Sequence, residues 1–271
     1  MSDPKKHHYV PQCYLKRFSS DKLNIKYFNK VSREHCIKKI DDVFQLENLY
    51  LLSQHEDPYF IEKTFFSYDI EDKLGDLLKF FEEINTEQCK INFNKDRRIK
   101  LSTQIVLQYM RTPFYRDIKS QSELEVYFDR IKQILNKINF EVEEISFLPN
   151  NNAEFHKTLL LEDKSKIISS IAEANWELLY INTGEFYSSD NPVSIISRKD
   201  KNVTAYCERI ISFSDIYYPL NSNLMLHITN TPSETFKNIP LNLITELEKN
   251  EINSIIIKNA VEGIIYKNEF K

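Results

Sequence analysis

The chain has 271 residues, of which 41% are hydrophobic and 13% aromatic, and its formal net charge is −4. This composition supplies a large apolar core and is too hydrophobic for an intrinsically disordered chain. The negative charge argues against a protein that coats nucleic acid over its whole surface, but it is compatible with a local basic site.

Glycine and cysteine usage excludes several further classes of site. Three glycines are present, and no two lie close in sequence, which rules out Walker loops, dinucleotide loops and a GxSxG nucleophile elbow. The four cysteines are equally dispersed, so a CxxC redox pair and a zinc-knuckle spacing are excluded and reduced thiols in the cytoplasm are expected. No apolar stretch approaches the roughly 20 residues that span a bilayer, so we expect no membrane partner.

The first half of the chain changes from strands to helices. Residues 23–29 and 34–40 predict a β-hairpin, and residues 48–52 a third strand. Apolar residues at helical spacing then predict a helix over 57–85, which begins at Asp57 and Pro58, and a second helix over 95–110. Residues 114–140 and 151–174 are read as two more helices.

The second half returns to short apolar runs separated by Asn, Asp and Ser. These runs predict strands of a meander at 176–182, 192–197, 209–213, 216–220 and 223–229, followed by a terminal helix over 240–264. The fold class is therefore α+β, with N-terminal short strands, a central helical bundle, C-terminal antiparallel strands and a terminal helix. Because there is no repeat or low-complexity linker, residues 1–271 are expected to form a single α+β domain.

The segment HHYVPQ near the N-terminus carries the adjacent histidines His7 and His8. Neighbouring side chains on a strand point to opposite faces, so we expect one histidine to face a cleft and the other to pack. Histidine suits proton transfer or metal ligation. The alternative is a pair of histidines at a frayed terminus.

Two carboxylates, Glu62 and Asp69, lie seven residues apart on one stripe of the predicted helix over 57–85. Such a pair can hold a divalent cation or share a proton. Lys73 follows Asp69 by four residues on the same stripe, so a solvated ion-pair ladder is an equally natural interpretation.

The predicted helix over 95–110 has a polar stripe on a strongly apolar background. Gln104, Gln108 and Arg111 share this stripe with Arg97, and the apolar remainder requires the helix to be largely buried. Arg116 follows shortly after. Arginine suits phosphate or carboxylate recognition, and the alternative for Arg111 is a buried ion pair with Glu62 or Asp69.

Taken together, these segments resemble the bacterial family of HHYVPQ-type proteins known as domain of unknown function 4238. The matching pieces are HHYVPQCYLKRF (7–18), the stretch ending in LENLY, the E-x6-D helix (62–69), Q-x2-R-T-P-x2-R (108–116), SDNPV (189–193) and YPLN (218–221). Asp69 departs from the usual glutamate and Cys13 from an aromatic. The resemblance implies no activity, but it implies a common motif set: His7, His8, Glu62, Asp69, Gln108, Arg111, Arg116, Asp190 and Asn191. By its residues alone, the segment with Asp190 and Asn191 is a turn before proline.

A second resemblance is to HNH nucleases, through HHYVP and LENLYLLSQH (46–55). In such a site His8 would activate water, Asn48 would orient it and His55 would bind the cation. The helix expected after Asn48 begins only near Asp57, so His55 would precede it. We therefore treat this match as coincidental.

Two functions remain open from the sequence. In the first, the protein is a nuclease or another phosphodiester-acting enzyme of bacterial defence. Its catalytic residues are then His7, His8, Glu62, Asp69 and Arg111, and its substrate-binding residues are Gln108, Arg116, Asp190 and Asn191. RNA or DNA would bind through a local basic site, and a divalent metal ion is a candidate cofactor. In the second, the same cluster is a non-catalytic binding module for an anionic ligand or partner. The sequence indicates no oligomeric state.

Overall fold

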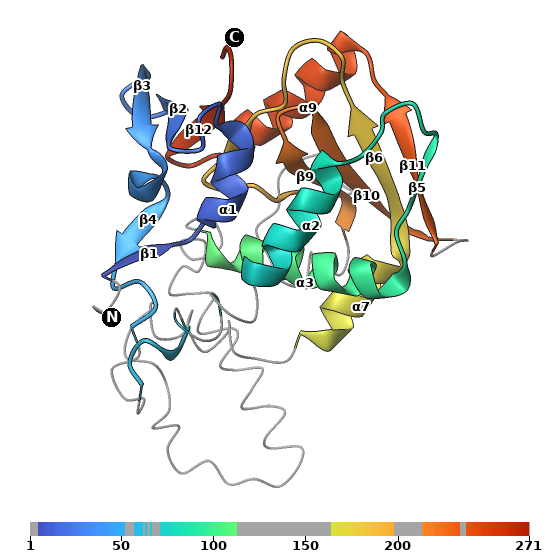
Figure 1. Cartoon of the computed structure of the whole chain (residues 1–271), viewed down its shortest axis with the longest axis horizontal. Coiled ribbons are helices and arrows are strands. Elements are labelled where there is room, and N and C mark those ends of the chain that lie inside the picture. Colours follow the sequence, from blue (N-terminus) through green and yellow to red (C-terminus); the bar gives the residue numbers. More distant parts are fainter. Residues whose placement is uncertain are drawn as a thin grey trace, which may run out of the picture.

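A computed structural model describes residues 5–51, 57–61, 63, 66, 71–112, 164–197, 213–233 and 237–270. It combines helices with largely antiparallel sheets, which confirms the α+β class. A six-stranded sheet forms the centre, with helices α1, α2, α3 and α7 on one face and α9 on the other (Figure 1). In these parts of the chain no helix is long and apolar enough to cross a membrane.

The N-terminal part consists of short strands and turns around two small sheets. The predicted hairpin is confirmed as β2 (Asn24–Asn29) and β3 (Glu34–Lys39). Before it lie β1 (Lys6–His8), α1 (Gln12–Leu15) and the 3-10 turn η1 (Lys16–Phe18); after it lie the 3-10 turn η2 (Ile40–Asp42) and β4 (Gln45–Glu47), which pairs with β1.

The strand predicted at 48–52 is wrong, because the chain turns there. Asn48 adopts a left-handed φ of 54°, a conformation that asparagine tolerates better than most residues. Its N–H donates to the Lys5 carbonyl at 2.9 Å and closes the β1–β4 pair. The pairing strand β4 therefore lies earlier than predicted.

Beside α1, the same face of the main sheet carries the longer helices α2 (Asp72–Glu82), α3 (Lys95–Arg111) and α7 (Ser165–Glu173). Helix α3 confirms the helix predicted over 95–110. It begins at Asn94, whose side chain accepts the Arg97 N–H at 3.0 Å and so caps the helix. The helix predicted over 114–140 and the first part of the one over 151–174 lie outside the described residues.

The central sheet has the strand order β5-β11-β6-β10-β9-β8. The predicted meander is found as β6 (Ala174–Tyr180), β8 (Ser194–Ser197), β9 (Phe213–Asn221) and β10 (Leu224–Pro232). The neighbours β5 (Lys90–Asn92) and β11 (Asn238–Leu243) extend it, and β11 runs parallel to β6. Of the strand predicted at 209–213, only Phe213 is described.

The predicted terminal helix over 240–264 is too long at both ends. The observed α9 (Glu246–Asn259) begins at a capping box between Thr245 and Glu248. Residues 238–243 form β11 instead, and β12 (Gly263–Tyr266) returns to the N-terminal hairpin in the sheet β3-β2-β12-β7, where β7 is Ser188–Ser189. At Gly263 a Cβ would lie 2.2 Å from the Tyr27 ring, so this strand pairing needs glycine.

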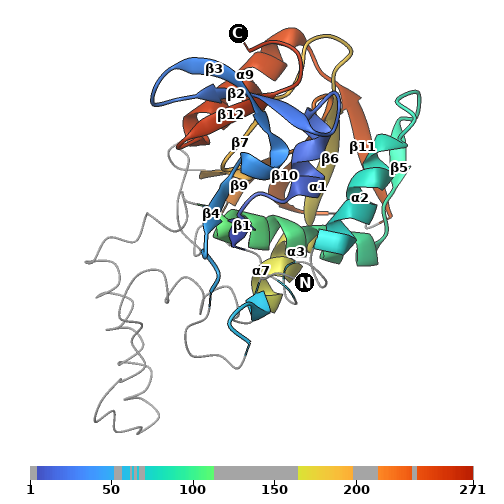
Figure 2. The same cartoon turned by 60° about the vertical axis from the view of Figure 1, so that its left-hand side comes forward.

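The two faces of the central sheet belong to two apolar clusters. The larger cluster joins the sheet to α1, α2, α3 and α7 around Trp176, which is fully buried. The smaller one places Ile252 and Ile256 of α9 over Leu179 and Met225 of the opposite face. Turning the molecule shows the β1–β4 pair lying beside α3, at the edge of the larger cluster (Figure 2).

Candidate functional site

Helix α3 holds the N-terminal histidine segment through two backbone carbonyls. Gln108 Nε2 donates to the carbonyl of Tyr9 at 2.9 Å, and Arg111 Nη2 donates to the carbonyl of His8 at 2.5 Å. Both side chains are almost completely buried, as the apolar background of the helix predicts. The histidine segment and the polar stripe of α3 therefore meet in the structure.

Arg111 is only 1% exposed and is surrounded by partners. Its Nη2 lies 2.9 Å from Glu71 Oε1, its Nε donates to Tyr50 Oη at 3.4 Å, and the guanidinium lies 3.8 Å above the Phe66 ring. Glu71 is thus one ion-pair partner of Arg111; Glu62 and Asp69, the partners that the sequence offered, lie outside the described residues, so their pairing with Arg111 stays a prediction. Nothing in the spacing of the acidic residues distinguishes Glu71, so sequence reasoning missed it.

His7 is a fully buried anchor of the segment. Its Nδ1 accepts the N–H of Tyr50 at 2.9 Å, and its ring stacks on the Tyr50 ring with centroids 5.7 Å apart. Because the Nδ1 lone pair is used in this way, neutral His7 carries its proton on Nε2. Protonation of Nδ1 would break the bond to Tyr50, so the geometry suits a structural role.

His8 presents the most reactive arrangement in the segment. Burial lowers its pKa below the ordinary value, although a hydrogen bond with the Ile40 carbonyl and the charge of Glu71 oppose the shift. The imidazole is therefore neutral near pH 7. Its buried Nε2 has no hydrogen-bond partner among the described residues, so the Ile40 carbonyl faces Nδ1 and the Nε2 lone pair remains available.

A second unpartnered acceptor lies directly across the strand pair from His8. In the β1–β4 register His8 is opposite Gln45, whose Oε1 is also buried without a partner among the described residues. Cβ atoms of directly opposed residues lie about 4.5–5.5 Å apart, on the same face. The two acceptors therefore lie on the same face of the strand pair, and each lacks a donor among the described residues.

Cys13 lies near this site but is a poor nucleophile. Its Sγ is 4.0 Å from the carbonyl oxygen of Glu71. Burial and the charge of Glu71 raise the pKa of the thiol to about 11. The reactive form of cysteine is the thiolate, so this thiol is inert near neutral pH.

Asp190 and Asn191 are buried and bind the loop after α9. Asp190 accepts the backbone N–H groups of Val261 and Glu262 at 2.7–3.2 Å, and Asn191 exchanges amide hydrogen bonds with Asn259. Burial raises the pKa of Asp190 to about 7 against those backbone donors. Within the described residues these bonds anchor β7 to the C-terminal loop rather than reach His8 or Arg111.

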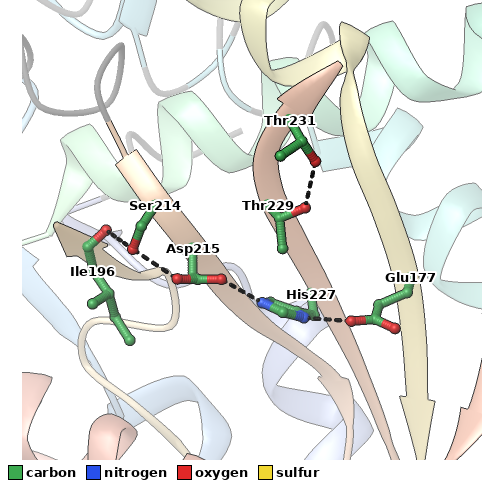
Figure 3. Close-up of polar contacts among 7 residues, drawn as sticks. All are labelled: Glu177, Ile196, Ser214, Asp215, His227, Thr229 and Thr231. Atoms are coloured by element: carbon green, nitrogen blue, oxygen red, sulfur yellow. Dashed lines mark hydrogen bonds and ion pairs between the residues drawn. The ribbon is translucent and has the colours of Figure 1, made fainter. Parts of the chain in front are cut away.

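A second polar centre, which the sequence did not indicate, lies across neighbouring strands of the central sheet (Figure 3). His227 of β10 bridges two carboxylates: its Nδ1 lies 2.7 Å from Glu177 of β6 and its Nε2 lies 2.9 Å from Asp215 of β9. Tyr217 stacks on the imidazole with centroids 4.4 Å apart, and Asn242 donates to Glu177 at 2.7 Å. His227, Glu177 and Asp215 come from three separate strands, so their spacing in the sequence does not reveal that they meet.

The chemistry of this centre follows from its charges. Burial alone would lower the pKa of His227, but hydrogen bonds to Asp215 and Glu177, and their charges, raise it to about 9. The ring is therefore an imidazolium that donates from both nitrogens at neutral pH. It has no free lone pair, so it serves structure better than base catalysis.

Three predicted site residues, Glu62, Asp69 and Arg116, lie outside the described residues, and their roles stay predictions. Across the described ranges, no three His, Cys, Asp or Glu side chains gather closely enough to hold a metal ion. The divalent metal expected from Glu62 and Asp69 accordingly stays a prediction as well.

The motifs of α3 and of the histidine segment lie within a stretch that matches a known protein family. The chain belongs to the family described as "Protein of unknown function (DUF4238)", whose model matches residues 6–270. No match was found among curated proteins or among solved structures.

Replacement of Arg111 by alanine should destabilise the protein strongly. The change leaves Glu71, Tyr50 Oη and the His8 carbonyl without their shared donor, and breaking a buried ion pair costs roughly 3–5 kcal/mol. Urea unfolding of the variant measures this loss. Lys100→Ala, which removes an exposed ion pair with Asp96 on the same helix, is the control and should change stability by about 0.5 kcal/mol or less. Equal urea midpoints for Arg111→Ala and Lys100→Ala would contradict the conclusion that Arg111 holds these segments together, a set of contacts called the Arg111 clamp below.

The His227 centre predicts a specific loss of stability at alkaline pH. The folded-state pKa of about 9 exceeds the ordinary value of 6.5. The stabilisation is therefore complete below about pH 6.5 and is lost as pH rises through about 9, an effect on the order of 2 kcal/mol. The free energy of unfolding of wild type minus that of His227→Gln should shrink over this range. A difference that stays constant from pH 6 to 9.5 would show that His227 is not held as an imidazolium.

Proposed function

We propose that this protein is a hydrolase that cleaves phosphodiesters, a nuclease of bacterial defence, with His8 as its general base. One observation carries the proposal: a neutral imidazole with an available Nε2 lone pair stands opposite a second unpartnered acceptor, Gln45 Oε1. Neutral histidine near pH 7 is the group best suited to remove a proton from water.

The step follows from the two acceptors. A water that donates to His8 Nε2 and Gln45 Oε1 has its oxygen lone pair directed away from both. As that oxygen bonds to phosphorus, the proton passes to His8 Nε2 and the ester oxygen departs, taking a proton from solvent. The imidazolium then releases its proton to solvent. Gln45 orients the water, and the Ile40 carbonyl holds the imidazole through Nδ1.

The sequence predicted Arg111 as a catalytic residue, and we propose a positioning role for it instead. Its guanidinium already contacts Glu71, Tyr50 and the His8 carbonyl, so we assign it as a positioning residue that holds β1 in place. Gln108 supports the same strand one helical turn earlier.

A second candidate, a non-catalytic binding module, is favoured by one specific observation. Gln108, Asp190 and Asn191 form hydrogen bonds with backbone groups of distant segments, so they hold the fold together. The motif set would then preserve the fold around an anionic ligand without turnover.

Turnover assays decide between the two functions. Purified protein is incubated with single-stranded RNA, tRNA, single-stranded DNA and duplex DNA, each with Mg²⁺, Mn²⁺, Zn²⁺ or chelator. The His8→Ala variant should lose about 10²–10⁴-fold in rate, and a cooperative melting curve at the assay temperature shows that it is folded. Lys100→Ala, an exposed substitution on α3, is the control and should cleave at the wild-type rate.

Two outcomes would contradict the proposal. Cleavage that survives in His8→Ala places the chemistry elsewhere. No cleavage of any substrate in any metal condition, together with tight binding, favours the binding module.

A further inference from the structure

The β2–β3 hairpin is strongly basic in an acidic protein. Residues 22–39 contain six basic side chains and one acidic one, a formal excess of +5, whereas the whole chain has a net charge of −4. Within the described residues none of the six forms an ion pair: Lys26 and Lys30 donate to backbone carbonyls and Lys38 lies over the Tyr27 ring. Lys22, Arg33 and Lys39 are exposed. Asp42 interacts electrostatically with Lys39 and Glu269 lies in the wall of the adjoining pocket, but the hairpin itself keeps a positive excess that can attract an anionic partner.

An aromatic pocket opens on the same hairpin. Its volume is about 370 Å³, and Lys26, His35, Ile37, Tyr266 and Phe270 are among its lining residues. In the strand register Ile37 is opposite Lys26, which is opposite Tyr266, so these side chains share one face of the sheet. Ile37 is 69% exposed. A planar aromatic ligand can enter this pocket between apolar and aromatic side chains, beside a lysine.

The hairpin leads to the His8 site. Strand β3 runs from Glu34 to Lys39 and continues directly into Ile40, whose carbonyl contacts the His8 ring. Six strand residues span about 20 Å. A chain that lies along β3 therefore has a direct route from the hairpin tip at Arg33, past Lys39, to His8.

We propose that the β2–β3 hairpin and its pocket bind single-stranded nucleic acid. Phosphates contact Arg33, Lys26 and Lys39, and one unstacked base enters the pocket. A duplex fits this surface poorly, since its bases are paired and cannot reach the aromatic side chains, whereas single strands combine a basic track with base stacking. The inference rests on the proposed function only where it leads the bound strand to cleavage at His8. The binding of nucleic acid to the hairpin does not depend on that function.

Fluorescence anisotropy tests binding without turnover. The His8→Ala variant is titrated with a labelled single-stranded RNA of about 12 nucleotides, in chelator and at several salt concentrations. The test variant adds Lys26→Gln, Arg33→Gln and Lys39→Gln. The control variant adds Lys79→Gln, Lys90→Gln and Lys237→Gln, which remove the same charge from α2, from β5 and from the residue before β11. Strands β5 and β11 lie at the opposite edge of the molecule from the β2–β3 hairpin, and α2 lies between (Figure 1).

The hairpin variant should bind at least about 10-fold more weakly, and the slope of log K against log salt should fall by about 2, because each phosphate contact contributes about 0.7. The control variant should bind as the parent does. Three results would overturn the inference: an equal loss of RNA affinity in the hairpin and control variants, an affinity for duplex equal to that for single-stranded RNA, or displacement of the labelled RNA by polyglutamate as effectively as by unlabelled RNA. The last result would identify an acidic protein as the partner.

The proposed function fails separately. If the protein binds RNA through the hairpin but cleaves no substrate, this inference stands and the proposed hydrolase function is refuted. Cleavage by wild type that is unaffected by the hairpin substitutions leaves the hydrolase and removes the inference.

Discussion

The buried guanidinium of Arg111 is the constraint on which the N-terminal half of the structure depends. It joins the His8 carbonyl, Tyr50 Oη and the Glu71 carboxylate, which come from three separate segments, to helix α3. A charge this deeply buried is tolerated only when its donors are paired. The short β1–β4 ladder has three residue pairs, and Arg111 ties its first strand to α3 through the His8 carbonyl. The orientation of His8 is a consequence.

The same clamp separates the roles of the two histidines. His7 is inside, with its Nδ1 bound to the Tyr50 backbone, whereas His8 lies opposite Gln45 and keeps Nε2 available. Alternation along a strand accounts for this difference. It also brings the reactive nitrogen to the end of the basic hairpin, so the proposed chemistry and the proposed binding surface are parts of one continuous region.

Hydrophobic periodicity predicted the elements in which the pattern of apolar and polar side chains shows which face is buried. The polar stripe of α3 with Gln108 and Arg111 is such a case, because an apolar background forces burial. The terminal helix was overextended although Thr245 and Glu248 form a readable capping-box signature. Glu71 and Gln45 were not predictable, since their partners are fixed by packing between distant segments. The His227 centre was missed for the same reason: its carboxylates lie on two different strands.

The most direct test of this account is the titration of His8 by NMR with ¹⁵N-labelled histidine, assigned by comparison with a His8→Gln variant. The account predicts a pKa below 6.5 and a neutral ring protonated on Nδ1, with Nε2 carrying the lone pair. A pKa at or above 6.5, or a ring protonated on Nε2, would contradict it, because His8 would then have no lone pair directed at the space it shares with Gln45.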